Sequence, residues 1–199
     1  MRINTTFLGL LLSITATAQL HIDYLSQLHY VQPLSDVWGY TAPDSSEYAL
    51  VGTFTGTSIV NISDPENPEE VQFVQGAIST WYDIKTWQHY AYVVNETAGG
   101  LLIIDLSDLP NSIDTTSWRG MGLATAHNIF IDENGFAYVL GANVQNGGAI
   151  IIDLNDNPWE PEFAGIYDEG YIHDSFVRGD TMWASEIHNG LLSVVVFSI

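Results

Sequence analysis

The chain has 199 residues, 46% of them hydrophobic and 12% aromatic, which is enough for one folded domain with a sizeable core and argues against intrinsic disorder. Its formal charge of −20 makes nucleic acid and anionic membranes unsuitable partners. Because the chain has no cysteine, disulfide bonds and thiolate metal ligands are excluded.

The first eighteen residues have the pattern of a secretory signal peptide. A short positive start, Met1-Arg2, precedes an apolar run over 7–14, and residues 16–18 (ATA) fit a small-residue cleavage site. The run is too short to span a bilayer, and no later segment is long and apolar enough to do so. We therefore expect signal peptide 1–18, a mature chain from Gln19, and a secreted or cell-surface location. The alternative is a buried N-terminal helix or strand.

Removal of this peptide would leave three basic residues, Lys85, Arg119 and Arg178, against 24 acidic ones. Such acidity has two interpretations. It keeps a protein soluble in a salty or cation-rich setting, or it binds cations weakly. We favour the first.

The rest of the chain, 19–199, repeats one pattern four times. The positions that align are spaced 42, 46 and 45 residues apart and are Leu50, Tyr92, Tyr138 and Trp183. A period of about 40 to 50 residues with short β-rich runs predicts one four-stranded sheet per repeat, as in the blades of a β-propeller. The repeats begin near Trp38, Tyr82, His127 and His173.

The composition of each repeat favours strands over helices. Residues 91–94 and 137–140 are β-branched and aromatic runs, whereas 101–104 and 150–152 are almost entirely apolar. Continuous apolar runs are typical of strands that are covered on both faces, as when blades pack on blades. Turn residues such as Asp132-Glu133-Asn134-Gly135 separate the runs. We therefore predict an all-β fold, a β-propeller.

Two levels of family resemblance accompany this pattern. Residues 90–94 (YAYVV) and 99–108 (GGLLIIDLSD) resemble the LVIVD repeat. Longer stretches, WGYTAPDSSEYALVGTFTGTSIVNISDP, WYDIKTWQHYAYVVNET, TAHNIFIDENGFAYVLG and HDSFVRGDTMWASEIHNG, resemble the choice-of-anchor B family of secreted bacterial surface proteins. The resemblance covers most of residues 38–193. It implies an LVIVD-type propeller at the bacterial surface and brings no catalytic residues with it.

The sequence departs from that family at its end. Members are usually longer and carry a variable C-terminal anchor, whereas this sequence stops at Ile199, inside the third strand of the fourth repeat. Val195 also stands where earlier repeats have Asp105 and Asp153. We expect a partial member whose last blade is incomplete and belongs to a larger propeller. In the alternative, a closed four-bladed ring, residues 25–31 supply the missing outer strand.

Polar residues recur where the first strand of each repeat begins. In a propeller this strand lines the central channel, and its start lies beside the end of the second strand. Counting back from Gly179 places His173 opposite Ser185, next to Glu186. The predicted axial cluster, with Glu96 nearby in a loop and Gly39 at the equivalent position of the first repeat, comprises Asp83, His127, Asn128, His173, Asp174, Glu186 and His188.

This cluster has two interpretations. Imidazole and carboxylate groups suit zinc, manganese or iron, and carboxylates suit calcium or magnesium, so a divalent cation is the cofactor that it would hold. In the other interpretation, which we favour, the same side chains tie neighbouring blades together through backbone hydrogen bonds. No nucleophile–base pair is visible, so the sequence assigns no catalytic residue.

Two further patterns are weaker. Asp153-x-Asn155-x-Asn157 matches the start of a calcium loop but lacks its glycine and its closing glutamate, so we predict a turn. The six tryptophans would form a carbohydrate platform if exposed, although at strand positions we expect core packing.

The leading functional hypothesis is a non-enzymatic, secreted β-propeller that acts as a binding or scaffold module for a surface protein or a glycan. The alternatives are a metal-dependent hydrolase that uses the axial cluster and a carbohydrate-binding propeller.

Overall fold

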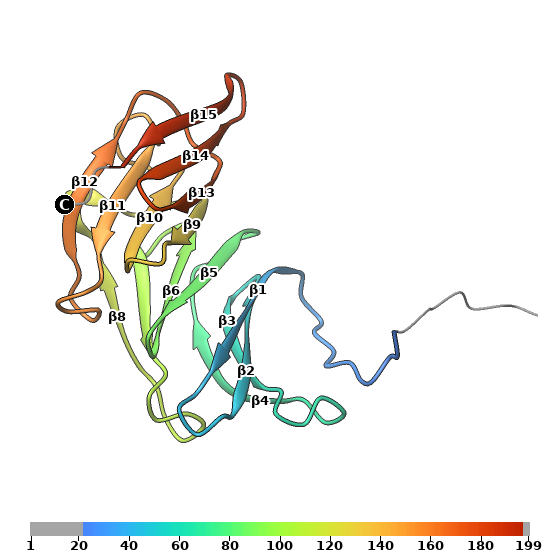
Figure 1. Cartoon of the computed structure of the whole chain (residues 1–199). Helices are drawn as coiled ribbons and strands as arrows, with labels where there is room; N and C mark the ends of the chain where they lie inside the picture. The colour runs from blue at the N-terminus through green and yellow to red at the C-terminus, as the bar shows by residue number, and fades with distance from the viewer. Residues whose placement is uncertain (1–21, 197–199) are drawn as a thin grey trace, which may run out of the picture.

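A computed structural model describes residues 22–196 of the chain, so the predicted signal peptide lies outside the described residues. Figure 1 shows sheets that follow one another around an arc. The first two sheets contain β1 (Leu34–Thr41), β2 (Glu47–Thr53), β3 (Gly56–Asn61) and β4 (Glu69–Gln75), then β5 (Tyr82–Trp87), β6 (Tyr90–Asn95), β7 (Leu101–Asp105) and β8 (Asp114–Trp118). A short 3-10 helix, η1 (Gly120–Gly122), precedes β9 (Asn128–Ile131), β10 (Phe136–Leu140), β11 (Ala149–Asp153) and β12 (Glu162–Tyr167), and then β13 (Asp174–Arg178), β14 (Thr181–Glu186) and β15 (Gly190–Val195).

Each sheet is an antiparallel meander in chain order. The orders are β1-β2-β3-β4, β5-β6-β7-β8, β9-β10-β11-β12 and β13-β14-β15. The first strand of each sheet contacts the first strand of the next, so β1, β5, β9 and β13 form the inner edge of the arc. This arrangement confirms the predicted all-β propeller with four blades, of which the fourth has three strands within residues 22–196.

An Asx turn ends the third strand of the first three blades. The side-chain oxygens of Asn61, Asp105 and Asp153 each accept the backbone N–H two residues later at 2.9 Å. Such a turn satisfies a backbone donor where the sheet hydrogen bonds stop, and it directs the chain toward the fourth strand. At 153–157 the structure therefore shows the predicted turn, which Asn157 extends by accepting the N–H of Trp159.

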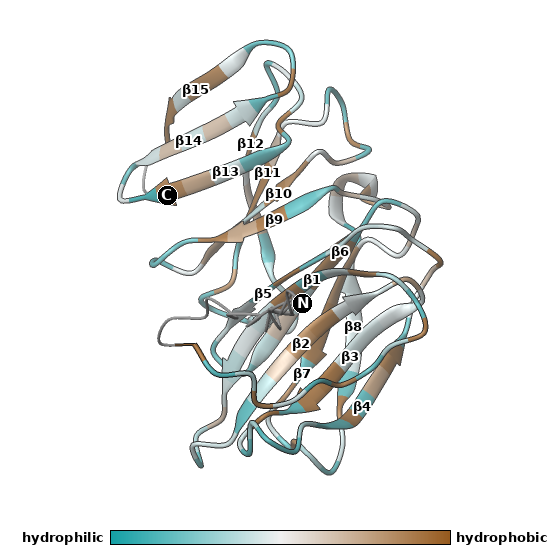
Figure 2. Cartoon of the chain, turned by 90° about the vertical axis from the view of Figure 1, so that its right-hand side faces the viewer, coloured by the Kyte–Doolittle hydropathy of each residue, from teal (hydrophilic) through white to brown (hydrophobic). Residues whose placement is uncertain are grey.

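The hydrophobic core lies between the blades. Strands alternate their side chains between two faces, so each middle blade contributes one apolar set to the preceding blade and another to the following one. Blade 2, for example, packs Val93 toward blade 1 and Tyr92 toward blade 3. Figure 2 shows hydrophobic colouring along the middle strands β2 and β3 of the first blade.

The fourth blade leaves one face open. The aligned residues Leu50, Tyr92 and Tyr138 point toward the next blade and are at most 1% exposed, whereas Trp183 at the same position is 38% exposed. Trp183 stacks against Phe176 of the neighbouring strand, with ring centroids 6.1 Å apart. The repeat alignment is thus correct, and the surroundings of its fourth member differ.

Two details of the predicted strands are wrong, one in the first blade and one in the fourth. The first strand begins at Leu34, four residues before the predicted start at Trp38, because strand β1 and the 42–46 loop are both longer than their counterparts in blade 2. In the fourth blade Asp174, rather than His173, pairs with Ser185. The predicted register was therefore off by one residue, and His173 precedes the strand.

Residues 25–31 do not complete the fourth blade. This segment lies over the free face of blade 1, where Tyr30 Oη is 2.8 Å from Ser58 Oγ and Ser26 Oγ donates to the carbonyl of Pro65 at 2.6 Å. Ser26, Leu28 and Tyr30 line a groove of about 340 Å³ together with residues of β2 and β3. Because Ser58 and the Pro65 carbonyl hold this segment on blade 1, the predicted ring closure by residues 25–31 is wrong.

Candidate functional site

The inner strands carry a row of equivalent polar residues. The members of this row lie 47, 45 and 46 residues apart and are Asp36, Asp83, Asn128 and Asp174. Asp36 takes the place that the sequence pattern assigned to Gly39. The repeat pattern did not predict Asp36 because the first strand begins at Leu34, earlier than the predicted start near Trp38.

The first two carboxylates join successive blades. Asp36 Oδ2 accepts the backbone N–H of Ile84 at 2.9 Å, and Asp83 Oδ1 accepts that of Ile129 at 3.4 Å. Each acceptor therefore serves the inner strand of the following blade, one residue beyond the equivalent position. Such bonds satisfy backbone donors that no sheet neighbour can reach on this edge. They are the structural links that we favoured from the sequence.

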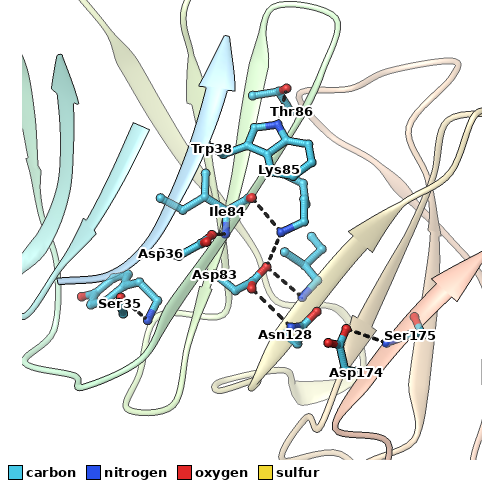
Figure 3. A network of polar contacts seen from close by, with 12 residues as sticks. Ser35, Asp36, Trp38, Asp83, Ile84, Lys85, Thr86, Asn128, Asp174 and Ser175 are labelled. Atoms are coloured by element: carbon cyan, nitrogen blue, oxygen red, sulfur yellow. Dashed lines mark hydrogen bonds and ion pairs between the residues drawn. The ribbon is translucent and has the colours of Figure 1, made fainter. Parts of the chain in front are cut away.

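Asp83 is also the centre of a network that includes one of the few cations in the chain (Figure 3). Lys85 Nζ lies 2.8 Å from Asp83 Oδ1 and 3.0 Å from the carbonyl of Ile84, and it sits 4.6 Å from the ring centroid of Trp38. Burial raises the pKa of Asp83, and the charge and hydrogen bond of Lys85 partly oppose this effect. Lys85 thus neutralises a carboxylate inside the arc.

The hydrogen bonds made by the row differ after the second blade. Asn128 Nδ2 donates to Asp83 Oδ2 at 3.3 Å, whereas Asp174 is exposed and its Oδ1 accepts the N–H of its neighbour Ser175 at 2.8 Å. Within residues 22–196 the buried Ser175 Oγ has no hydrogen-bond partner. Of the predicted row, Asp83 and Asn128 therefore contact one another directly, and Asp174 makes a local bond instead (Figure 3).

Three titratable side chains meet at the end of the blades where the inner strands begin: Glu96 lies in the β6–β7 loop, and His127 and His173 directly precede β9 and β13. His127 Nδ1 lies 2.7 Å from Glu96 Oε1, and the rings of His127 and His173 have centroids 4.1 Å apart. The side chain of His127 is 16% exposed and that of Glu96 is 41% exposed. The structure thus brings the two predicted histidines together, and Glu96, expected in a nearby loop, is the hydrogen-bond partner of the His127 ring.

Backbone hydrogen bonds hold this cluster in place. Asn95 Oδ1 accepts the N–H groups of Thr97 and Ala98, which folds the loop that carries Glu96. The N–H of His127 donates to Leu140 O at 3.0 Å, and that of His173 donates to Ser185 O at 2.9 Å. Both histidines therefore continue the hairpin hydrogen bonding just outside β9 and β13.

Two exposed aromatic side chains flank the histidines. Trp81, 50% exposed, meets the ring of His127 edge-on at a centroid distance of 6.3 Å. Tyr171 is 38% exposed, and its hydroxyl lies over Gly141, where an added Cβ would be 2.7 Å away. Trp81, Glu96, His127, Tyr171 and His173 are called the loop-face cluster below. The exposure of Trp81 also departs from the expected core packing of the tryptophans.

The remaining two predicted residues are not part of it. Glu186 Oε2 accepts a hydrogen bond from Asn189 at 2.6 Å, and its carboxylate lies beside Gly170. His188 is exposed in the turn between β14 and β15, and its side chain makes no hydrogen bond within residues 22–196. In the described part of the chain, no group of three or more His, Asp and Glu side chains is arranged to hold a metal ion. The described residues also include no helix long and apolar enough to cross a membrane.

The sheets and the repeat define the protein as a β-propeller. Residues 45–75 and 82–113, in blades 1 and 2, match the LVIVD repeat family. The solved structure of the periplasmic gluconolactonase PpgL from Pseudomonas aeruginosa has a similar fold, with a TM-score of 0.56 and 13% identity over 82% of this chain and 54% of that chain. The chain thus spans about half the length of that structure. No curated protein matches the sequence.

Proposed function

We propose that the protein is a secreted or cell-surface β-propeller that acts as a non-enzymatic binding or scaffold module. The observation that carries this proposal is the use of the inner polar residues. Asp36 and Asp83 accept backbone N–H groups of the next blade, and Lys85 pairs with Asp83, so these charges hold blades together. A surface protein or a glycan is the partner that we propose.

Three observations support a location outside the cytoplasm. The N-terminal sequence has the order of charge, apolar run and small residues that secretion requires. The similar PpgL is periplasmic. The longer sequence motifs resemble the choice-of-anchor B family, to which we propose that this chain belongs. A fusion of residues 1–25 to a reporter enzyme, assayed for export from a bacterial cell, tests the location.

A second candidate function is hydrolysis. A carboxylate that fixes the tautomer of an imidazole leaves the other ring nitrogen free to act as a base, and Glu96 and His127 have this relation. The gluconolactonase activity of the similar structure is a second reason to test it.

One set of measurements separates the two functions. The purified chain and the variants His127→Ala and His173→Ala are assayed for bound metal, for lactone and ester hydrolysis, and for unfolding temperature. We expect no stoichiometric metal and no turnover. Bound metal or turnover that disappears in both variants would overturn the scaffold proposal and favour the hydrolase.

A further inference from the structure

We infer that the loop-face cluster is a binding site for an uncharged sugar. This inference rests on the proposed function as a binding module and names the ligand class. The cluster joins exposed aromatic rings to hydrogen-bonding groups, and it lies where loops from blades 2, 3 and 4 meet.

The aromatic part of the cluster is exposed and held in place. Trp81 and Tyr171 are 50% and 38% exposed, although large aromatic side chains normally bury most of their surface. Tyr171 fits closely because its neighbours are glycines. Gly141 and Gly147 have φ angles of 59° and 77°, and an added Cβ would come within 2.8 Å of the Tyr171 ring or its hydroxyl. The Tyr171 ring therefore packs against two backbone positions that only glycine fits well.

The polar part offers both acceptors and donors. Glu96 uses Oε1 for His127, which leaves Oε2 to accept a ligand hydroxyl, and a His127 ring that donates from Nδ1 has Nε2 as a further acceptor. The imidazole of His173, with its centroid 4.1 Å from that of His127, and the Tyr171 hydroxyl add adjacent polar atoms. A sugar is complementary to these groups, since its C–H face packs on aromatic rings and the hydroxyls around its ring donate and accept hydrogen bonds.

Charge selects among sugars. The chain carries a net charge of −20, and Lys85 is already engaged by Asp83. Arg178 ends β13 at the opposite end of the blade from His173. Arg119, which follows β8 and lies beside Gly100 of the β6–β7 loop, is the one arginine of the described residues at this end, and its single positive charge is small beside the net charge of the chain. An anionic sugar would meet Glu96 and a strongly negative field, so uronates and sugar phosphates are disfavoured relative to neutral sugars.

Hydrogen bonds between the loops pre-organise the loop-face cluster for binding. Asn143 Oδ1 accepts the N–H groups of Ala124 and Thr125, which joins the loop before β9 to the loop after β10. Together with the Asn95 turn, these bonds fix the loop that leads to His127 and the loop that carries Glu96. A pre-organised site loses less conformational entropy on binding than a mobile one.

The test uses the full chain on an array of neutral and acidic oligosaccharides, with each hit then titrated as the free sugar by calorimetry. The variants are Trp81→Ala and Glu96→Gln, and the matched control is His89→Gln. His89 lies in the β5–β6 hairpin at the other end of the blade and stacks on Tyr90 with centroids 4.2 Å apart. Circular dichroism verifies that all variants fold.

We expect neutral sugars to bind and acidic analogues to bind more weakly. Trp81→Ala and Glu96→Gln should each weaken binding by about 10-fold or more, which corresponds to about 1.4 kcal/mol, whereas His89→Gln leaves affinity unchanged. Absence of any neutral hit, or equal affinity in the folded Trp81→Ala and Glu96→Gln variants, would overturn the inference. The proposed scaffold function would survive that result, because it is tested separately by metal content and turnover.

Discussion

The contribution of the Asp83 carboxylate to the stability of the fold depends on pH. Burial raises its pKa above the ordinary value of 3.8, so the folded chain binds the proton more tightly than the unfolded chain does. Its contribution to stability is therefore fully present below about pH 3.8 and is lost as the pH rises through the folded pKa. We expect the stability of the wild type, measured relative to Asp83→Asn, to fall between acidic and neutral pH.

This comparison is made by urea unfolding at several pH values, and a tenfold change in the ionisation constant corresponds to about 1.4 kcal/mol. The amide of the variant still accepts the Ile129 N–H and does not titrate, while the other carboxylates cancel between the two proteins. A difference that rises with pH would contradict the assignment.

Asp132 is a second residue whose role is defined by its bonds. It is 5% exposed, and it accepts the N–H groups of Asn134 and Phe136 at 2.9 Å and the hydroxyl of Tyr138 at 3.1 Å. Asp132→Ala would leave these donors unsatisfied, so we expect a loss of about 2–4 kcal/mol in unfolding free energy, against about 1 kcal/mol for Tyr138→Phe. Chemical denaturation measures both. The exposed Asp180, in the hairpin of the fourth blade, is the control, and its replacement by alanine should cost less than about 0.5 kcal/mol.

At the level of the element, equivalent strand positions differ in what covers them. Tyr92 and Trp183 occupy the same place in β6 and β14, but Tyr92 is fully buried against blade 3 and Trp183 is 38% exposed. Tyr92→Ala should therefore cost about 3–5 kcal/mol, because it opens a cavity in the core. Trp183→Ala should cost about 1 kcal/mol, through its contact with Phe176. Equal losses in thermal or urea unfolding would show that the fourth blade is covered in solution.

The strands themselves could be predicted because their signals are local and recur. The runs that include Tyr92 and Tyr138, the turn residues after them and the spacing of the repeats all indicated the four blades. The start of β1 could not be predicted in the same way, because a longer strand and hairpin shifted Asp36 relative to Asp83. The one-residue error at His173 has a similar cause, since register depends on the turn geometry.

At the level of the whole molecule, the candidate site could be predicted only in part. The repeat showed that His127 and His173 would lie at the same end of adjacent blades. It did not show that Lys85 would form an ion pair with Asp83, or that Glu96 would lie 2.7 Å from His127, because both contacts depend on where the side chains point. The exposure of Trp81 likewise follows from how the loops pack, for which the sequence carries no periodic signal.

The net charge of −20 leads to a prediction for the molecule as a whole. Carboxylates spread over one domain repel one another, and salt weakens this repulsion as the screening length falls from about 30 Å at 0.01 M to about 10 Å at 0.1 M. We therefore expect the unfolding temperature to rise with NaCl over this range, and KCl to have the same effect at equal ionic strength. Calorimetric scans measure both series.

A parallel series with CaCl₂ at matched ionic strength distinguishes screening from a specific cation site. Screening depends on ionic strength, whereas a site that binds calcium in the folded chain stabilises it according to the free calcium concentration. Since the described residues hold no cluster suited to a metal ion, we expect no additional rise at about 1 mM calcium, roughly the affinity range of weak extracellular calcium modules. A rise in unfolding temperature well beyond that in NaCl would show that some of the acidic side chains bind calcium, and would contradict the interpretation that they serve only solubility.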